Sequence, residues 1–182
     1  RAVLRMRGAP RVVEAAAVKA VLGDFLDRRI GDRVGLLLFG QRAYAMTPLT
    51  LDRDSVRQQL DDSVVGLAGQ ETAIGDAIAL AVKRLTEQPD PREAKGQRVV
   101  ILLTDGVNTA GSILPDKAAE LAERTQVRVH TIGFGGDGAR ASIFDMPMPA
   151  RSQIDETTLR EIAIRTGGRY LRARDTRDIK GC

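Results

Sequence analysis

The chain has 182 residues, a length that predicts one domain, and its 43% hydrophobic and 29% charged residues are typical of a globular fold. A single cysteine, Cys182, and a single histidine, His130, exclude a disulfide framework and metal sites built from several of these residues. The formal net charge of +4 comes from arginines interleaved with acids, and only 3% of the residues are aromatic, which argues against a nucleic-acid partner.

The apolar pattern predicts alternating helices and strands. In chain order we expect a helix over 13–29, strands over 34–39 and 43–47, helices over 51–60 and 73–86, a strand over 99–103, a helix over 116–124, a strand over 127–132, a helix over 155–166 and a strand over 170–173. Pro48 closes the second of these strands, which we expect at an edge of the sheet. No apolar run is long enough to span a membrane, although the chain could be a segment of a longer, membrane-tethered protein.

This alternation predicts an α/β fold, a doubly wound and mostly parallel sheet with helices on both faces. Ligands of such sheets bind at the carboxyl ends of the strands. Asp105 directly follows the most apolar strand, and Thr72 begins a helix, so both are candidate oxygen ligands for a hard cation such as Mg²⁺. Two structural alternatives stay open: Thr72 as the N-cap of its helix and Asp105 as a turn residue.

Two other patterns are weaker candidates. Residues 133–138 match the G-x-G-x-x-G dinucleotide fingerprint, but no helical pattern follows them, so we expect a loop there. His130 lies in the middle of a strand, and no nucleophile elbow accompanies it, so we expect a packed or hydrogen-bonded histidine of the sheet.

Five segments occur in an order that resembles the von Willebrand factor type A domain, most closely that of the bacterial aerotolerance (Bat) membrane proteins. They read IGDRVGLLLF (30–39), TPLT (47–50), ETAIGDA (71–77), VILLTDGVNTAG (100–111) and VHTIG (129–133). The likeness covers about residues 12–176, within a single domain over 1–182.

The resemblance implies a Rossmann-like sheet with a metal-ion-dependent adhesion site at its carboxyl edge. In that family an Asp-x-Ser-x-Ser loop, a threonine and an aspartate hold the metal, and a partner protein's carboxylate completes its coordination. Thr72 matches the threonine and Asp105 the aspartate. Bat-type proteins are anchored in the bacterial inner membrane, with the domain expected to face the periplasm, and are associated with MoxR-type AAA+ ATPases and with one another.

The Asp-x-Ser-x-Ser element is absent, because residues 1–10 read RAVLRMRGAP. Either the motif lies upstream of Arg1, or it has degenerated within residues 5–9. The full-length protein could therefore bind Mg²⁺, whereas we expect this chain to bind it weakly or not at all, since Arg5 or Arg7 would also repel a cation.

The first strand of this fold lies in the middle of the sheet, and residues 2–6 are the only unassigned segment able to fill that position. We expect them to do so, which makes the first strand atypical. The alternative is a truncated strand, with these residues forming a loose arm or swapping into a neighbouring chain. The resemblance implies a protein-interaction module, and we expect no enzyme. Two other functions compete with this prediction: a metal-dependent phosphohydrolase, which needs further convergent carboxylates, and a metal-free scaffold domain.

Overall fold

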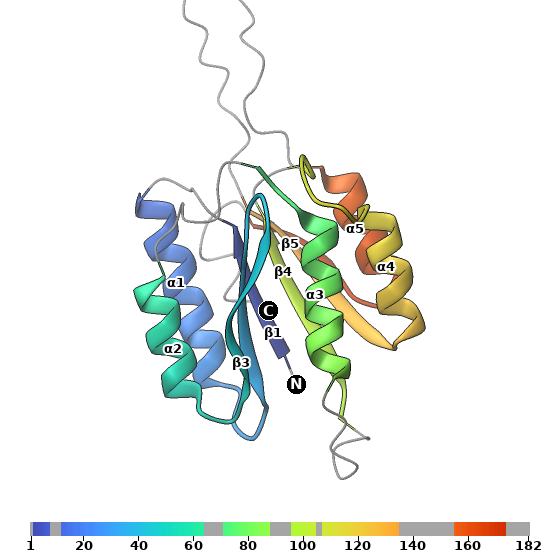
Figure 1. Ribbon diagram of the computed structural model, residues 1–182. Helices are drawn as coiled ribbons and strands as arrows, with labels where there is room; N and C mark the ends of the chain where they lie inside the picture. The colour runs from blue at the N-terminus through green and yellow to red at the C-terminus, as the bar shows by residue number, and fades with distance from the viewer. Residues whose placement is uncertain are drawn as a thin grey trace, which may run out of the picture.

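The computed structural model describes residues 2–7, 12–63, 71–87, 96–104, 107–134 and 155–173 (Figure 1). They form β1 (Ala2–Arg7), α1 (Val12–Asp27), β2 (Val34–Phe39), β3 (Ala43–Thr50), α2 (Arg53–Asp62), α3 (Ile74–Thr86), β4 (Arg98–Thr104), α4 (Pro115–Arg124), β5 (Val127–Phe134), α5 (Glu156–Arg165) and β6 (Tyr170–Ala173). No helix within these ranges has the length and apolar character needed to cross a bilayer.

The six strands form one sheet in the order β3-β2-β1-β4-β5-β6, in which only β3 runs antiparallel to its neighbour. Helices α1 and α2 lie on one face of the sheet, and α3, α4 and α5 lie on the other (Figure 1). This arrangement confirms the expected doubly wound, mostly parallel α/β sheet. The strand order reverses between β1 and β4, which places the ligand-binding crevice of such folds at the carboxyl ends of these strands.

Strand β1 occupies the central position expected for residues 2–6. Its backbone pairs with β2 on one side, Leu4 opposite Leu36, and with β4 on the other, Leu4 opposite Ile101. The pairing excludes the loose arm, because it satisfies the backbone groups that an empty slot would leave buried without partners.

Strand β3 is the edge strand expected from the sequence, but the prediction that Pro48 ends it was wrong. The strand continues to Thr50, and its register with β2 shifts between Leu36 and Leu37 and again between Val34 and Leu36. Proline lacks the N–H that a regular ladder requires, so it is tolerated at an irregular edge such as this one.

The helices begin and end within about two residues of the expected bounds, and side chains cap two of them. Asp52 caps α2 by accepting from the Ser55 N–H at 3.0 Å, and Asp155 caps α5 by accepting from the Thr158 N–H at 3.0 Å. After α5, Gly167 has a φ of +69° and ends the helix as predicted, because glycine adopts this left-handed conformation without steric cost.

Buried side chains form two clusters, one on each face of the sheet. The larger cluster includes Phe39, Ile78 and Leu159 and lies under α3, α4 and α5. The smaller includes Leu26, Leu60 and Ile132 and lies under α1 and α2.

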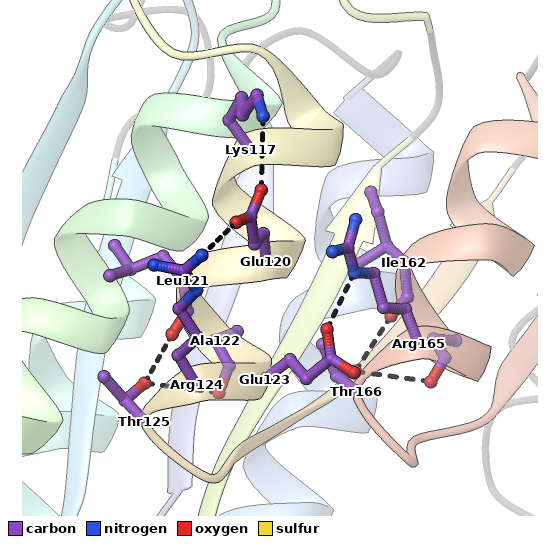
Figure 2. Close-up of polar contacts among 11 residues, drawn as sticks. Lys117, Glu120, Leu121, Ala122, Glu123, Arg124, Thr125, Ile162, Arg165 and Thr166 are labelled. Atoms are coloured by element: carbon purple, nitrogen blue, oxygen red, sulfur yellow. Dashed lines mark hydrogen bonds and ion pairs between the residues drawn. The ribbon is translucent and has the colours of Figure 1, made fainter.

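Exposed ion pairs connect the outer surfaces of α4 and α5 (Figure 2). Arg165 Nε donates to Glu123 Oε2 at 2.9 Å and joins the two helices, while Glu120 pairs with both Lys117 and Arg124 along α4. The hydrogen bond to Glu123 raises the pKa of Arg165, and the hydrogen bond from Lys117 lowers the pKa of Glu120. Exposed pairs of this kind contribute little to stability, so packing beneath the helices holds this layer together.

Candidate functional site

Thr72 lies at the carboxyl edge of the sheet and is held by the loop that follows β4. Its backbone N–H donates to Thr109 Oγ1 at 2.9 Å, and its carbonyl accepts from the N–H groups of Thr109 at 2.9 Å and Ala110 at 3.2 Å. These three bonds join segments 37 residues apart in sequence and fix the backbone of Thr72 in one position.

The two residues after Thr72 also form hydrogen bonds with neighbouring loops. The Ala73 N–H donates to the Gly40 carbonyl at 2.8 Å, which attaches this segment to the end of β2. The Ile74 N–H donates to Asn108 Oδ1 at 2.8 Å. Three loops that follow or face the strand ends are therefore connected by hydrogen bonds.

The N-cap alternative for Thr72 was wrong. The N-cap of α3 is Ala73, which has no side-chain acceptor, and Asn108 supplies the missing acceptor from the neighbouring loop. The Thr72 side chain is fully buried, and its Oγ1 has no hydrogen-bond partner among the described residues. A buried hydroxyl without a partner costs free energy, so its presence calls for a ligand or another explanation.

Asp105, the second candidate ligand, lies outside the described residues, between Thr104 at the end of β4 and Val107. Thr104 itself is almost fully buried, 1% exposed. Within the described ranges, no group of three or more histidine, cysteine, aspartate or glutamate side chains is placed to hold a metal ion.

The residues that follow the first strand do not supply the missing ligands. Residues 8–11 read GAPR, and the first carboxylate of the chain is Glu14 in α1. A hard cation requires about six oxygen ligands, and among the described residues the buried Thr72 hydroxyl is free to serve as one of them. The described residues therefore fit part of such a site.

Asp76 and two glycines shape the loop after β4. Asp76 Oδ1 accepts from the N–H groups of Ser112 at 2.8 Å and Ile113 at 2.7 Å. Gly111 has a φ of +106°, and a Cβ on Gly75 would lie 1.8 Å from the Ile113 carbonyl oxygen. Sequence reasoning gave Asp76 and Asn108 no role, although an aspartate in the first turn of a helix and an asparagine in a loop are both common acceptors for backbone N–H groups.

An open cleft of about 610 Å³ is lined by Glu71, the residue before Thr72, and by residues of three neighbouring segments. Its polar lining comes from the turn after β2, from the residue before Thr72, from α3 and from the loop after β4: Gln41, Arg42, Glu71, Asp76 and Ser112. Arg42 and Glu71 are exposed, so a partner that contacts the site meets charges of both signs.

His130 is a hydrogen-bonded histidine of the sheet, as expected. Its Nδ1 accepts from the Arg169 N–H at 3.1 Å, and burial, together with the charges of Arg128, Arg169 and Arg29, lowers its pKa. The loop expected over residues 133–138, the G-x-G-x-x-G match, begins later than predicted, because β5 continues through Gly133 and Phe134. Positions 135–138 lie outside the described residues.

Comparison with known proteins agrees with this geometry. The model of the von Willebrand factor type A domain matches residues 11–181. An uncharacterised protein of Borreliella burgdorferi is 29% identical over 163 residues; the match covers 86% of this chain and 46% of that protein, so the chain spans about half the length of this relative.

Two solved structures share the fold. BatB from Bacteroides thetaiotaomicron has a TM-score of 0.74 and 22% identity, with 99% of this chain and 97% of that chain covered. An aerotolerance-related membrane protein from Bacteroides fragilis has a TM-score of 0.76 and 23% identity, with 99% and 94% covered. Both agree with the expected likeness to Bat-type proteins.

Proposed function

The chain belongs to the von Willebrand factor type A family, and we propose that it binds a carboxylate of a partner protein at the carboxyl edge of its sheet. Domains of this family are protein-interaction modules and are generally not catalytic. The observation that carries the proposal is the Thr72 hydroxyl, which is fully buried and has no partner among the described residues.

Thr72 and Asp105 form a partial metal-ion-dependent adhesion site in this proposal. Hydrogen bonds with Thr109, Ala110 and Gly40 hold the backbone around Thr72, so the position of the hydroxyl is fixed before a partner binds. A metal bound there would supply a positive charge for the partner's carboxylate. The chain lacks the Asp-x-Ser-x-Ser element, so any metal would be held weakly without further ligands.

The proposed partners are other Bat-type proteins or a MoxR-type ATPase, and the proposed location is the periplasmic side of the bacterial inner membrane, with anchoring by segments outside this chain. The motifs between residues 30 and 133 support the Bat-type assignment. The Bacteroides fragilis protein of the same fold is described as an aerotolerance-related membrane protein, which is consistent with this location.

Replacement of Thr72 by valine tests the proposal, because valine keeps the shape of threonine and removes its hydroxyl. Thr47→Val is a matched control: Thr47 is also buried, and its Oγ1 also lacks a partner among the described residues, but it lies in β3. Binding of the immobilised chain to a Bat-type protein and to a MoxR-type ATPase would be measured with Mn²⁺ and with EDTA.

We expect Thr72→Val and Asp105→Asn each to weaken binding at least about tenfold, because each removes one charge-assisted contact. Thr47→Val should leave binding unchanged. Equal binding by the Thr72→Val variant and the unmodified chain would contradict the proposal. Hydrolysis of a phosphate ester that is lost in Asp105→Ala would instead support the phosphohydrolase. If the carboxyl edge of the sheet shows neither binding nor hydrolysis, the result would support a scaffold domain.

A further inference from the structure

Three arginine side chains surround His130 on the face of the sheet that packs against α1. Arg128 lies two residues before His130 in β5 and therefore on the same face of the strand. Arg169 donates its backbone N–H to His130 Nδ1 at 3.1 Å. Arg29, just after α1, lies 4.4 Å above the ring of Phe25, which packs against the core cluster on this face.

These positive charges are not neutralised within the described part of the chain. Arg29, Arg128 and Arg169 are exposed, and none of them forms an ion pair with a described carboxylate. The charged groups that lower the pKa of His130, after burial, are these three arginines.

The neutral side chain of Gln97 orients one of the three arginines, Arg128. With its amide oxygen turned toward Arg128, Gln97 accepts from the two terminal guanidinium nitrogens at 2.9 and 3.2 Å. This contact restricts Arg128 without removing its charge, so the guanidinium group remains available to an anion.

We propose that this arginine patch, formed by Arg29, Arg128 and Arg169, binds the phosphate groups of an anionic lipid surface. Guanidinium groups match the oxygen geometry of phosphate. The patch consists of exposed side chains from three separate segments: the turn after α1, strand β5 and the turn before β6. None of the three arginines lines the described cavities between β2, β3 and α3, between α4 and α5, or beside Glu71. Exposed guanidinium groups that are spread over a surface are expected to bind a membrane with many phosphate groups better than they bind a single small anion.

The position of the patch is compatible with simultaneous use of the candidate site. Arg29 follows the end of α1 and Arg169 precedes β6, so both lie toward the amino ends of the parallel strands. Thr72 lies at the opposite, carboxyl edge. A lipid surface at the patch would therefore leave the candidate site open to a partner.

Co-sedimentation with vesicles tests the proposal. We expect the chain to bind vesicles of phosphatidylglycerol and phosphatidylcholine and not vesicles of phosphatidylcholine alone. Neutralising each arginine, as Arg29→Gln, Arg128→Gln or Arg169→Gln, is expected to weaken binding about fivefold, and the triple variant about a hundredfold. Arg42→Gln is the matched control, because Arg42 is also exposed but lies at the carboxyl edge; this variant should bind like the unmodified chain.

Three results would overturn the proposal. The first is equal binding to the neutral and anionic vesicles, and the second is an equal loss in Arg42→Gln and in the patch variants. The third is binding of inorganic phosphate or of a polyglutamate peptide, dependent on the patch, without binding to vesicles; this would assign the patch to a small anion or to an acidic protein. Thermal unfolding of each variant verifies that the exposed substitutions leave the domain folded.

Discussion

Asn108 Oδ1 accepts a hydrogen bond from the Ile74 N–H at 2.8 Å, so a side chain in the loop after β4 caps the helix that follows Thr72. The residue at the N-cap position, Ala73, cannot perform this role. The two segments that carry the candidate ligands are therefore coupled: an alteration of the loop after β4 changes the start of α3 and, with it, the surroundings of Thr72.

Replacement of Asn108 by alanine is expected to destabilise the domain by about 1 kcal/mol, the usual cost of a lost helix cap. Asn108→Asp should retain the acceptor and be at least as stable, because a negative charge is favourable at a helix N-terminus. Denaturant unfolding of both variants measures the difference. Equal stability of the alanine and aspartate variants would show that the cap has no energetic role.

Gly75 is expected to tolerate no side chain. A Cβ at this position would lie 1.8 Å from the Ile113 carbonyl oxygen, a backbone atom that other contacts hold in place, so Gly75→Ala should cost about 3 kcal/mol. Gly23→Ala in α1 is the control, because its Cβ would meet the guanidinium end of Arg57, a flexible group that can move. Chemical denaturation should show Gly23→Ala as stable as the unmodified domain or more stable, because alanine favours the helix. A similar loss in the two variants would contradict this interpretation.

The sequence predicted the architecture where local pattern determines it. Val100 and Leu102 are fully buried in β4, and the apolar run that contains them already predicted a buried strand. The pattern failed at strand ends: β3 passes Pro48 through register shifts, and β5 continues through Gly133. These ends depend on pairing with a neighbouring strand, which a single segment does not encode.

The candidate site was predictable in part for the same reason. Thr72 stood out because it precedes a helix and matches a family motif. Its partners did not, because Asn108 meets Ile74 across 34 residues and Asp76 meets Ile113 across 37. Hydrogen bonds of this range follow from the tertiary structure and leave no periodic signal in the sequence.

His130 is expected to make stability depend on pH near neutrality. Its pKa in the folded state lies below the ordinary value of 6.5, mainly because of burial and also because of the nearby arginines. The unfolded chain therefore binds more protons in this range, and the free energy of unfolding should fall as the pH drops from about 7.5 through 6.5.

His130→Asn isolates this contribution, because asparagine Oδ1 can replace Nδ1 as the acceptor for the Arg169 N–H and does not titrate. Denaturant unfolding between about pH 5.5 and pH 7.5, above the range in which the carboxylates titrate, should give a flatter profile for the variant. A profile that is unchanged by the substitution would contradict the assignment to His130.

Magnesium is expected to bind this chain only at millimolar concentrations or above, because Thr72 and Asp105 supply too few of the roughly six oxygens that the ion requires. Calorimetric titration with Mg²⁺ and Mn²⁺ measures this affinity, and a micromolar site would contradict the prediction.

A designed metal-binding motif tests the position of the site. If residues 8–12 replace the missing motif, the triple substitution Gly8→Asp, Pro10→Ser and Val12→Ser restores Asp-x-Ser-x-Ser directly after β1. This variant should bind Mn²⁺ at least about tenfold more tightly, because it adds a carboxylate and two hydroxyl ligands. Adding Thr72→Val to it should abolish the gain, whereas adding Thr47→Val should not. A gain that survives Thr72→Val would place the metal elsewhere.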